Sequence, residues 1–192
     1  MRYWIFLFAI LAIASRSVLA ADYTAAFPSA MSNLISPNGK YMVVNVDYDH
    51  RVPHHALFIV NESRKQRIYL YSYSRHVDIS WALDSAHLYI NDYAGSDNSD
   101  CLIYGVSNMS IVRIANVLQK YNLESSQIKH NGHVYIKCSK WISNKRVAVE
   151  VSGYGGGNPN GFNIYYVYEL GKKPRPLKIR GTETDLRNRL MY

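Results

Sequence analysis

The segment LISPNGKYMVV, residues 34–44, sets the pattern for the whole chain. An apolar pair is followed by a polar turn and then by a run of strand-forming residues. Asn38 and Gly39 suit a tight turn, because glycine takes positive φ freely and asparagine bonds to its own backbone. The same plan recurs in SWALDSAHLYI, residues 80–90, and, one residue shorter, in KWISNKRVAV, residues 140–149. The sequence therefore contains three related units.

Each unit continues in the same way: a strand, a polar loop, a third strand, a short turn and a fourth strand. The 17 tyrosines and the many valines and isoleucines also favour strands. The predicted strands cover residues 31–35, 40–46, 56–61 and 66–71, then 77–81, 87–92, 101–106 and 110–114, then 133–141, 146–151, 162–169 and 175–179. We therefore expect an all-β fold of three four-stranded antiparallel units, with a short amphipathic helix near residues 115–123.

Two of the turns carry a family resemblance. Residues 36–40 and 81–86 resemble the W-S-P-D-G-K turn of TolB-like, WD-type β-propeller repeats, and residues 141–145 are a more decayed copy. The resemblance covers about residues 30–180, with repeats at about 30–72, 77–115 and 132–180 inside one β domain, residues 21–180. It implies that each unit is a propeller blade. Closed propellers have about four to eight blades, so three interpretations stay open: an array capped by the C-terminal tail, a ring completed by a homodimer, or a sandwich without a propeller axis.

The N-terminal residues predict the compartment. A cationic start at Arg2 is followed by an apolar run over residues 3–14 and by small residues that end at Ala20. This matches a secretory signal peptide, residues 1–20. The alternative is an uncleaved anchor, but a spanning helix needs about 20 apolar residues and Arg16 interrupts this run. We expect an exported, periplasmic or secreted protein with no transmembrane segment in its mature part.

Only two cysteines are present, Cys101 and Cys138, and both lie in predicted strands. An oxidising compartment permits a disulfide between them. Two separate buried thiols remain the alternative, because a bridge also requires that the two Cα atoms lie close together.

The charge distribution predicts little about partners. The formal net charge is +8, and it falls to +6 when Arg2 and Arg16 leave with the signal peptide. Part of the excess lies in residues 171–192, where seven lysines and arginines accompany two acids, and residues 181–192 are the predicted C-terminal tail of this basic region. Such a run is usually a solvated tail, and the alternative is a site for anionic envelope polymers. We expect no nucleic-acid partner.

Three polar loops occupy equivalent places in the three units, at residues 47–55, 92–100 and 152–161. Each has a tyrosine near its start: Tyr48, Tyr93 and Tyr154. Amphipathic rings in polar loops commonly anchor partners. If the units are blades, these loops share one face. We therefore predict a binding face that contains the three tyrosines together with Asp47 and Asp92.

No catalytic signature is visible. The glycine-rich run of residues 153–161 leads into a strand and lacks the Lys-Ser or Lys-Thr of a phosphate loop, and no serine-hydrolase elbow occurs. The histidine and aspartate spacings fit no metal site, so we expect no metal and no cofactor. The leading hypothesis is a non-enzymatic exported module that binds a protein or an envelope polymer. The alternatives are a small hydrolase using Asp47, Asp92 or Asp97 with His54 or His55, and a structural envelope protein.

Overall fold

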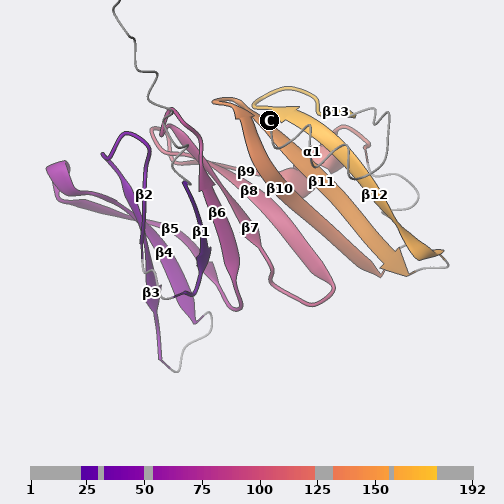
Figure 1. Cartoon of the computed structure of the whole chain (residues 1–192), viewed down its shortest axis with the longest axis horizontal. Helices are drawn as coiled ribbons and strands as arrows, with labels where there is room; N and C mark the ends of the chain where they lie inside the picture. The colour runs from indigo at the N-terminus through magenta and orange to yellow at the C-terminus, as the bar shows by residue number, and fades with distance from the viewer. Residues whose placement is uncertain (1–22, 30–32, 50–53, 124–131, 156–157, 177–192) are drawn as a thin grey trace, which may run out of the picture.

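The computed structural model describes residues 23–29, 33–49, 54–123, 132–155 and 158–176. Over these residues the chain is mostly β, as predicted, with one short α-helix (Figure 1). The elements are β1 (Thr24–Phe27), β2 (Asn33–Ile35), β3 (Met42–Asp47), β4 (His55–Asn61), the 3-10 turn η1 (Glu62–Arg64), β5 (Gln66–Tyr73), β6 (Val77–Trp81), β7 (His87–Asp92), β8 (Asn98–Gly105), β9 (Ser110–Arg113), α1 (Ile114–Lys120), β10 (His133–Ser143), β11 (Arg146–Gly155), β12 (Asn158–Glu169) and β13 (Arg175–Pro176).

The strands form two sheets. The first unit, β2–β5, is a separate four-stranded antiparallel sheet. The second unit, β6–β9, and the third, β10–β13, belong to one nine-stranded sheet, which β1 joins through β6. Strand β9 pairs only with residues 102–105 of β8. The start of β8 pairs instead in parallel with Val134 and Tyr135 of β10, and this pairing joins the second and third units into one sheet. The predicted separation of the second and third units is therefore incomplete, and β1 was not predicted.

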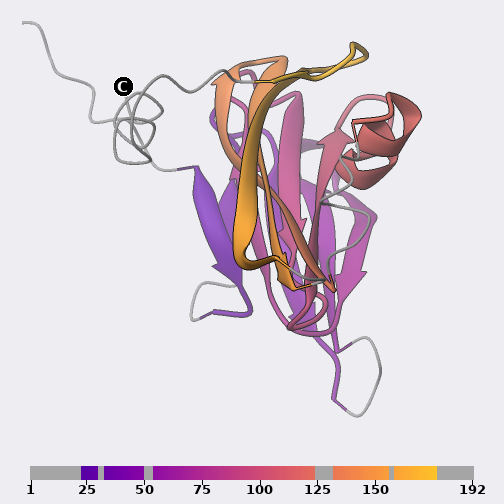
Figure 2. The same cartoon turned by 90° about the vertical axis from the view of Figure 1, so that its right-hand side faces the viewer.

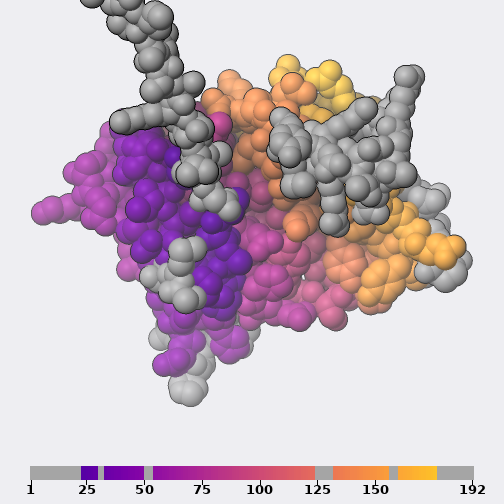
Figure 3. Space-filling view, in the orientation of Figure 1, coloured from indigo at the N-terminus to yellow at the C-terminus, as the bar shows by residue number. Residues whose placement is uncertain are grey.

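The units follow one another as layers along the long axis (Figures 1 and 3). One core lies between the first and second units, and another lies between the second and third. The middle layer contributes to both: Leu88 and Ile90 of β7 enter the first core, and Tyr89 enters the second. Successive strand residues point to opposite faces, so a strand between two cores is apolar on both. This is why residues 101–104, CLIY, read as a continuous apolar run.

The short helix α1 belongs to the second core. Its Ile114 and Leu118 are buried there, four residues apart and therefore on one face. The helix begins at Ile114 and ends at Lys120, somewhat earlier than the predicted 115–123. Figure 2 shows it projecting at one side of the layered strands.

The first two repeat turns have the same hydrogen bonds. Gly39 donates its backbone N–H to Ser36, and Ser85 donates to Ala82, each at 2.9 Å. Gly39 and Ser85 both have positive φ, 70° and 59°. The third turn is shorter, because Ser143 pairs directly with Arg146. The turns of the first two units therefore have the same backbone conformation although their residues differ.

A tryptophan links each of the later units to the preceding one. The indole Nε1 of Trp81 donates to the carbonyl of Leu34 at 3.4 Å, and that of Trp141 donates to Ser80 at 3.1 Å. Leu34 and Ser80 each lie two residues before the repeat turn of their unit. The repeat therefore includes the tryptophan hydrogen bond that connects each later unit to the preceding one.

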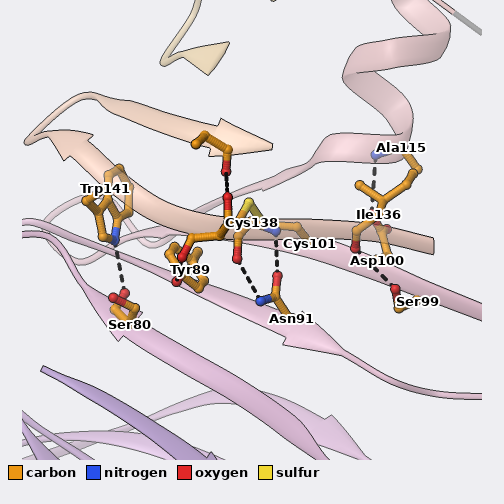
Figure 4. Close-up of a disulfide and its surroundings, with 12 residues drawn as sticks. Ser80, Tyr89, Asn91, Ser99, Asp100, Cys101, Ala115, Ile136, Cys138 and Trp141 are labelled. Atoms are coloured by element: carbon orange, nitrogen blue, oxygen red, sulfur yellow. Dashed lines mark hydrogen bonds between the residues drawn. A yellow bond between two sulfur atoms is a disulfide. The ribbon is translucent and has the colours of Figure 1, made fainter. Parts of the chain in front are cut away.

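A disulfide joins the second unit to the third. Cys101 of β8 and Cys138 of β10 are bonded, with their Cα atoms 5.7 Å apart, which decides the pairing that the sequence left open. Beside it, the buried Asn91 side chain donates to the carbonyl of Cys138 at 2.9 Å and accepts from its N–H at 2.8 Å (Figure 4). The boundary between the two units is therefore held covalently and by hydrogen bonds to the backbone of one residue.

Two predicted loops are shorter in the structure. The second loop narrows to residues 93–97, because β8 begins at Asn98. The predicted third loop, 152–161, is mostly strand: β11 continues to Gly155 and β12 starts at Asn158. Cross-strand pairing with β10 stabilises this extension, since Tyr154 lies opposite His133.

Some predictions lie outside the described residues, namely the signal peptide (1–20) and the basic tail (181–192). Among the helices that the structure does describe, none has the length and apolar character needed to cross a membrane.

Candidate functional site

The strand ends of the three units meet at one edge, which we call the hairpin edge. Here β3, β7 and β11 end and β4, β8 and β12 begin, at the bottom of Figure 1. Hydrogen bonds cross this edge between the units. Tyr71 of β5 donates to Asp92 at the end of β7, and Tyr135 of β10 donates to the carbonyl of Ser96. The candidate residues of all three units therefore lie along this edge.

In the first unit, Asp47 forms a polar cluster at the end of β3. Its carboxylate accepts from His55 Nδ1 at 2.7 Å and from the Asn45 side chain. The hydrogen bond from His55 is the main cause that holds the pKa of Asp47 below its usual range. The His55 ring stacks on Tyr73 with 4.8 Å between centroids. Tyr48, which is half-buried, donates its backbone N–H to His54.

In the second unit, Asp92 and Tyr93 are largely engaged inside the fold. Asp92 is 8% exposed and accepts from the Tyr71 hydroxyl at 2.6 Å. The Tyr93 hydroxyl donates to Asp78 at 2.8 Å, and its ring stacks on His76 at 4.2 Å. Burial is the main cause that raises the pKa of Tyr71 and of Tyr93. The hydrogen bond from Tyr71 to Asp92 connects the first and second layers and leaves Asp92 little surface for a ligand.

In the third unit, Tyr154 is open to solvent and held in place at the same time. The side chain is 48% exposed, and its ring stacks on His133 with 4.3 Å between centroids. Its hydroxyl oxygen is 3.4 Å from that of Tyr135, and this hydrogen bond is the main cause that raises the pKa of Tyr135. An exposed ring that is already oriented loses little entropy when a partner covers it.

Tyr154 borders a shallow cavity of about 450 Å³, which we call the tyrosine dish. A Cβ atom at Gly153 would collide with the His133 carbonyl and the Phe162 ring, and one at Gly161, with φ 69°, would lie 2.7 Å from the Gly153 oxygen. The two glycines therefore leave the strands close together and the surface hollow. The dish is lined by Tyr135, Ser152, Gly153, Tyr154, Asn160, Gly161, Phe162 and Asn163.

Most of the dish was not predicted from the sequence. Tyr135, Ser152 and Asn163 lie side by side on three neighbouring strands, as the pairing of β10, β11 and β12 shows. The available signal was the alternation of polar and aromatic residues with apolar ones in 133–138 and 149–154. Alternation identifies the outward residues of each strand, but only the register tells which of them become neighbours.

The residues weighed for hydrolysis or metal binding do not assemble. Asp47 contacts His55, whereas Asp92 is bonded to Tyr71, and Asp97 is exposed in the loop before β8. His54 is exposed, and His50 lies outside the described residues. Over the described part of the chain, no three His, Cys, Asp or Glu side chains are grouped so that they could hold a metal ion.

Comparisons with known proteins identify the fold class alone. No protein-family model and no curated protein sequence matches this chain. Among solved structures, it is similar to the β-propeller domain of the trilobed protease from Pyrococcus furiosus, described as having an open velcro topology. The TM-score is 0.51 at 12% identity, over 77% of this chain and 42% of that one. A structure from a study of two prolyl endopeptidases is also similar, with a TM-score of 0.45 at 11% identity, over 83% of this chain and 22% of that one.

The chain thus has a propeller-like β fold. It spans less than half the length of each of the two solved chains described above.

Proposed function

We propose that this chain is an exported binding module and that a protein partner docks on the tyrosine dish. The proposal rests mainly on the position of Tyr154. Its ring is exposed at the rim of a cavity, and stacking on His133 fixes the orientation of the ring. The dish consists of tyrosine, serine, glycine, asparagine and one phenylalanine. Tyrosine gives rigid amphipathic contact area, and the small polar residues give adaptable hydrogen bonds, which is also the composition of antibody binding loops.

The proposed architecture is three propeller blades, one per unit. The identical turn bonds of the first two units and the tryptophan bonds between successive units support this assignment. The likeness to a propeller domain supports it at the level of the fold. Propeller-like domains commonly present a binding surface on a rigid scaffold, and the dish lies on paired strands.

Export is part of the same proposal. The sequence of residues 1–20 has the features of a secretory signal peptide. The disulfide between Cys101 and Cys138 is consistent with an oxidising, extracytoplasmic compartment. Both observations favour a partner among exported or envelope proteins.

Alanine substitution tests the proposal. Tyr154→Ala is expected to lower the amount of partner recovered from the exported proteins of the host by about 30-fold or more, the loss that follows from about 2 kcal/mol at a binding hot spot. Ile111→Ala is the matched control, because Ile111 is a strand residue that is 52% exposed and lies outside the dish. Equal recovery of every partner by both variants would refute the assignment of the dish.

A further inference from the structure

We propose that the outer face of the first sheet, β2–β5, binds the same face of a second copy of this chain. The inference is independent of the tyrosine dish, which lies on the third unit at the other end of the stack of layers.

The outer face of this sheet is apolar in its middle and polar at two edge positions. Strand pairing places Ile35, Met42 and Val60 in one row that ends at Arg67, and Val44, Phe58 and Tyr69 in the next row, which begins at Asn33. The alternate residues of the same strands, such as Val43 and Ile59, point the other way into the first core. None of the six outer residues belongs to either core or to the side chains packed against one. Ile35 and Tyr69 are each 56% exposed.

The opposite end of the stack has a different character. On the outer face of the third unit, Tyr135, Ser152 and Asn163 form one cross-strand row, and Lys137, Glu150 and Tyr165 form the next. Layered repeat proteins need such polar faces on their terminal units. Large contiguous apolar patches mark interaction sites. Hence the third unit ends in a polar face, whereas the first unit presents a surface suited to burial.

The mismatch between the two ends favours a symmetric contact. Head-to-tail association would place the apolar face of the first unit on the polar face of the third. A two-fold axis instead places the apolar face on its own copy, and such isologous contacts are the commonest in homo-oligomers.

Charge along the strands selects the orientation. Lys40, Arg64, Lys65, Arg67 and Glu62 lie at one end of the sheet, a balance of 4 − 1 = +3. Asp47 and Asp49 lie at the other end together with the exposed Arg75, which follows β5, a balance of −2 + 1 = −1 over the described residues. A two-fold axis in the plane of the face and across the strands sets the cationic end of each copy on the acidic end of the other. Arg67 already lies over the Phe58 ring, 4.0 Å from its centroid.

The test is the solution mass of the protein purified from the exported fraction of its host, measured by sedimentation equilibrium from about 1 to 100 μM. We expect the wild type to have the mass of two chains. Val44→Glu, in the middle of the face, is expected to weaken the dimer by at least 100-fold. Ser152→Glu, the same change on the outer face of the third unit, is expected to leave the dimer intact.

A charge exchange tests the orientation. Arg67→Asp is expected to weaken the dimer about tenfold, and the double variant Arg67→Asp with Asp47→Arg is expected to restore it. Circular dichroism identifies any variant that fails to fold, and Val60→Lys then replaces Val44→Glu. A monomeric wild type at 100 μM, or a dimer that Val44→Glu and Ser152→Glu affect equally, would overturn the proposal. Neither result would alter the comparison of Tyr154→Ala with Ile111→Ala.

Discussion

At the scale of single residues, buried polar side chains connect the layers. Asn91 is 1% exposed and satisfies both the N–H and the carbonyl of Cys138. Asp92 is 8% exposed and receives the Tyr71 hydroxyl. The sequence predicted Asp92 on the exposed binding face and made no prediction for Asn91. They are buried because the first and third units cover the two faces of the second.

Asn91→Ala is expected to lower the free energy of unfolding by about 2–4 kcal/mol, because it leaves two buried backbone groups without partners, each costing about 1–3 kcal/mol. Urea denaturation measures the loss. Asn163→Ala removes an amide from the surface and is expected to cost less than about 0.5 kcal/mol. If the two variants are equally stable, the bonds of Asn91 to Cys138 contribute nothing to the fold.

At the scale of elements, the sequence pattern correctly predicted strands that pair with their neighbours along the chain. The ranges 77–81 and 87–92 were predicted as β6 and β7 are observed, because the turn between them and the apolar residues on either side identify a hairpin. Strand β1 was missed, since it has only four residues and pairs with β6, about fifty residues further along the chain. The parallel pairing of β8 with β10 was missed for the same reason, and with it the neighbours that form the tyrosine dish.

The repeat turn makes a prediction at this scale. Gly39→Ala is expected to cost roughly 1–2 kcal/mol, because the residue has φ 70° while no atom lies within 4 Å of the added Cβ. Gly132→Ala meets equally open space without positive φ, and it is expected to be neutral or to stabilise by about 0.4–1 kcal/mol. Thermal unfolding of both variants separates the cost of backbone strain from that of steric collision. Equal melting temperatures would contradict the account of the turn.

At the scale of the whole molecule, the layers depend on contacts between distant segments. The disulfide spans 37 residues and joins the second and third units at their common boundary. In the chain-entropy model, closing a loop of this length contributes about 3–4 kcal/mol. Replacing both Cys101 and Cys138 by alanine is therefore expected to lower the free energy of unfolding by about that amount. The reduced wild type should behave in the same way, and unchanged stability in either would show that the bridge is dispensable.

The molecule as a whole then presents two different surfaces: an apolar face on the first unit and a polar, aromatic dish on the third. The three tyrosines predicted to share a binding face do lie along one edge. Their environments differ, however, because Tyr93 is bonded to Asp78 and stacked on His76 of its own unit, whereas Tyr154 is exposed. That difference depends on which side chains the folded strands bring beside each ring, and the sequence of a single repeat does not show this.

The most direct test of the binding account is photo-crosslinking in the living host. A benzophenone amino acid replaces Tyr154 in one variant and Ile111 in another, and both are irradiated and analysed by mass spectrometry. The account predicts a discrete adduct with another exported protein from position 154 and none from position 111. No adduct from position 154, or the same adducts from both positions, would contradict the claim that the tyrosine dish is the site where the partner docks.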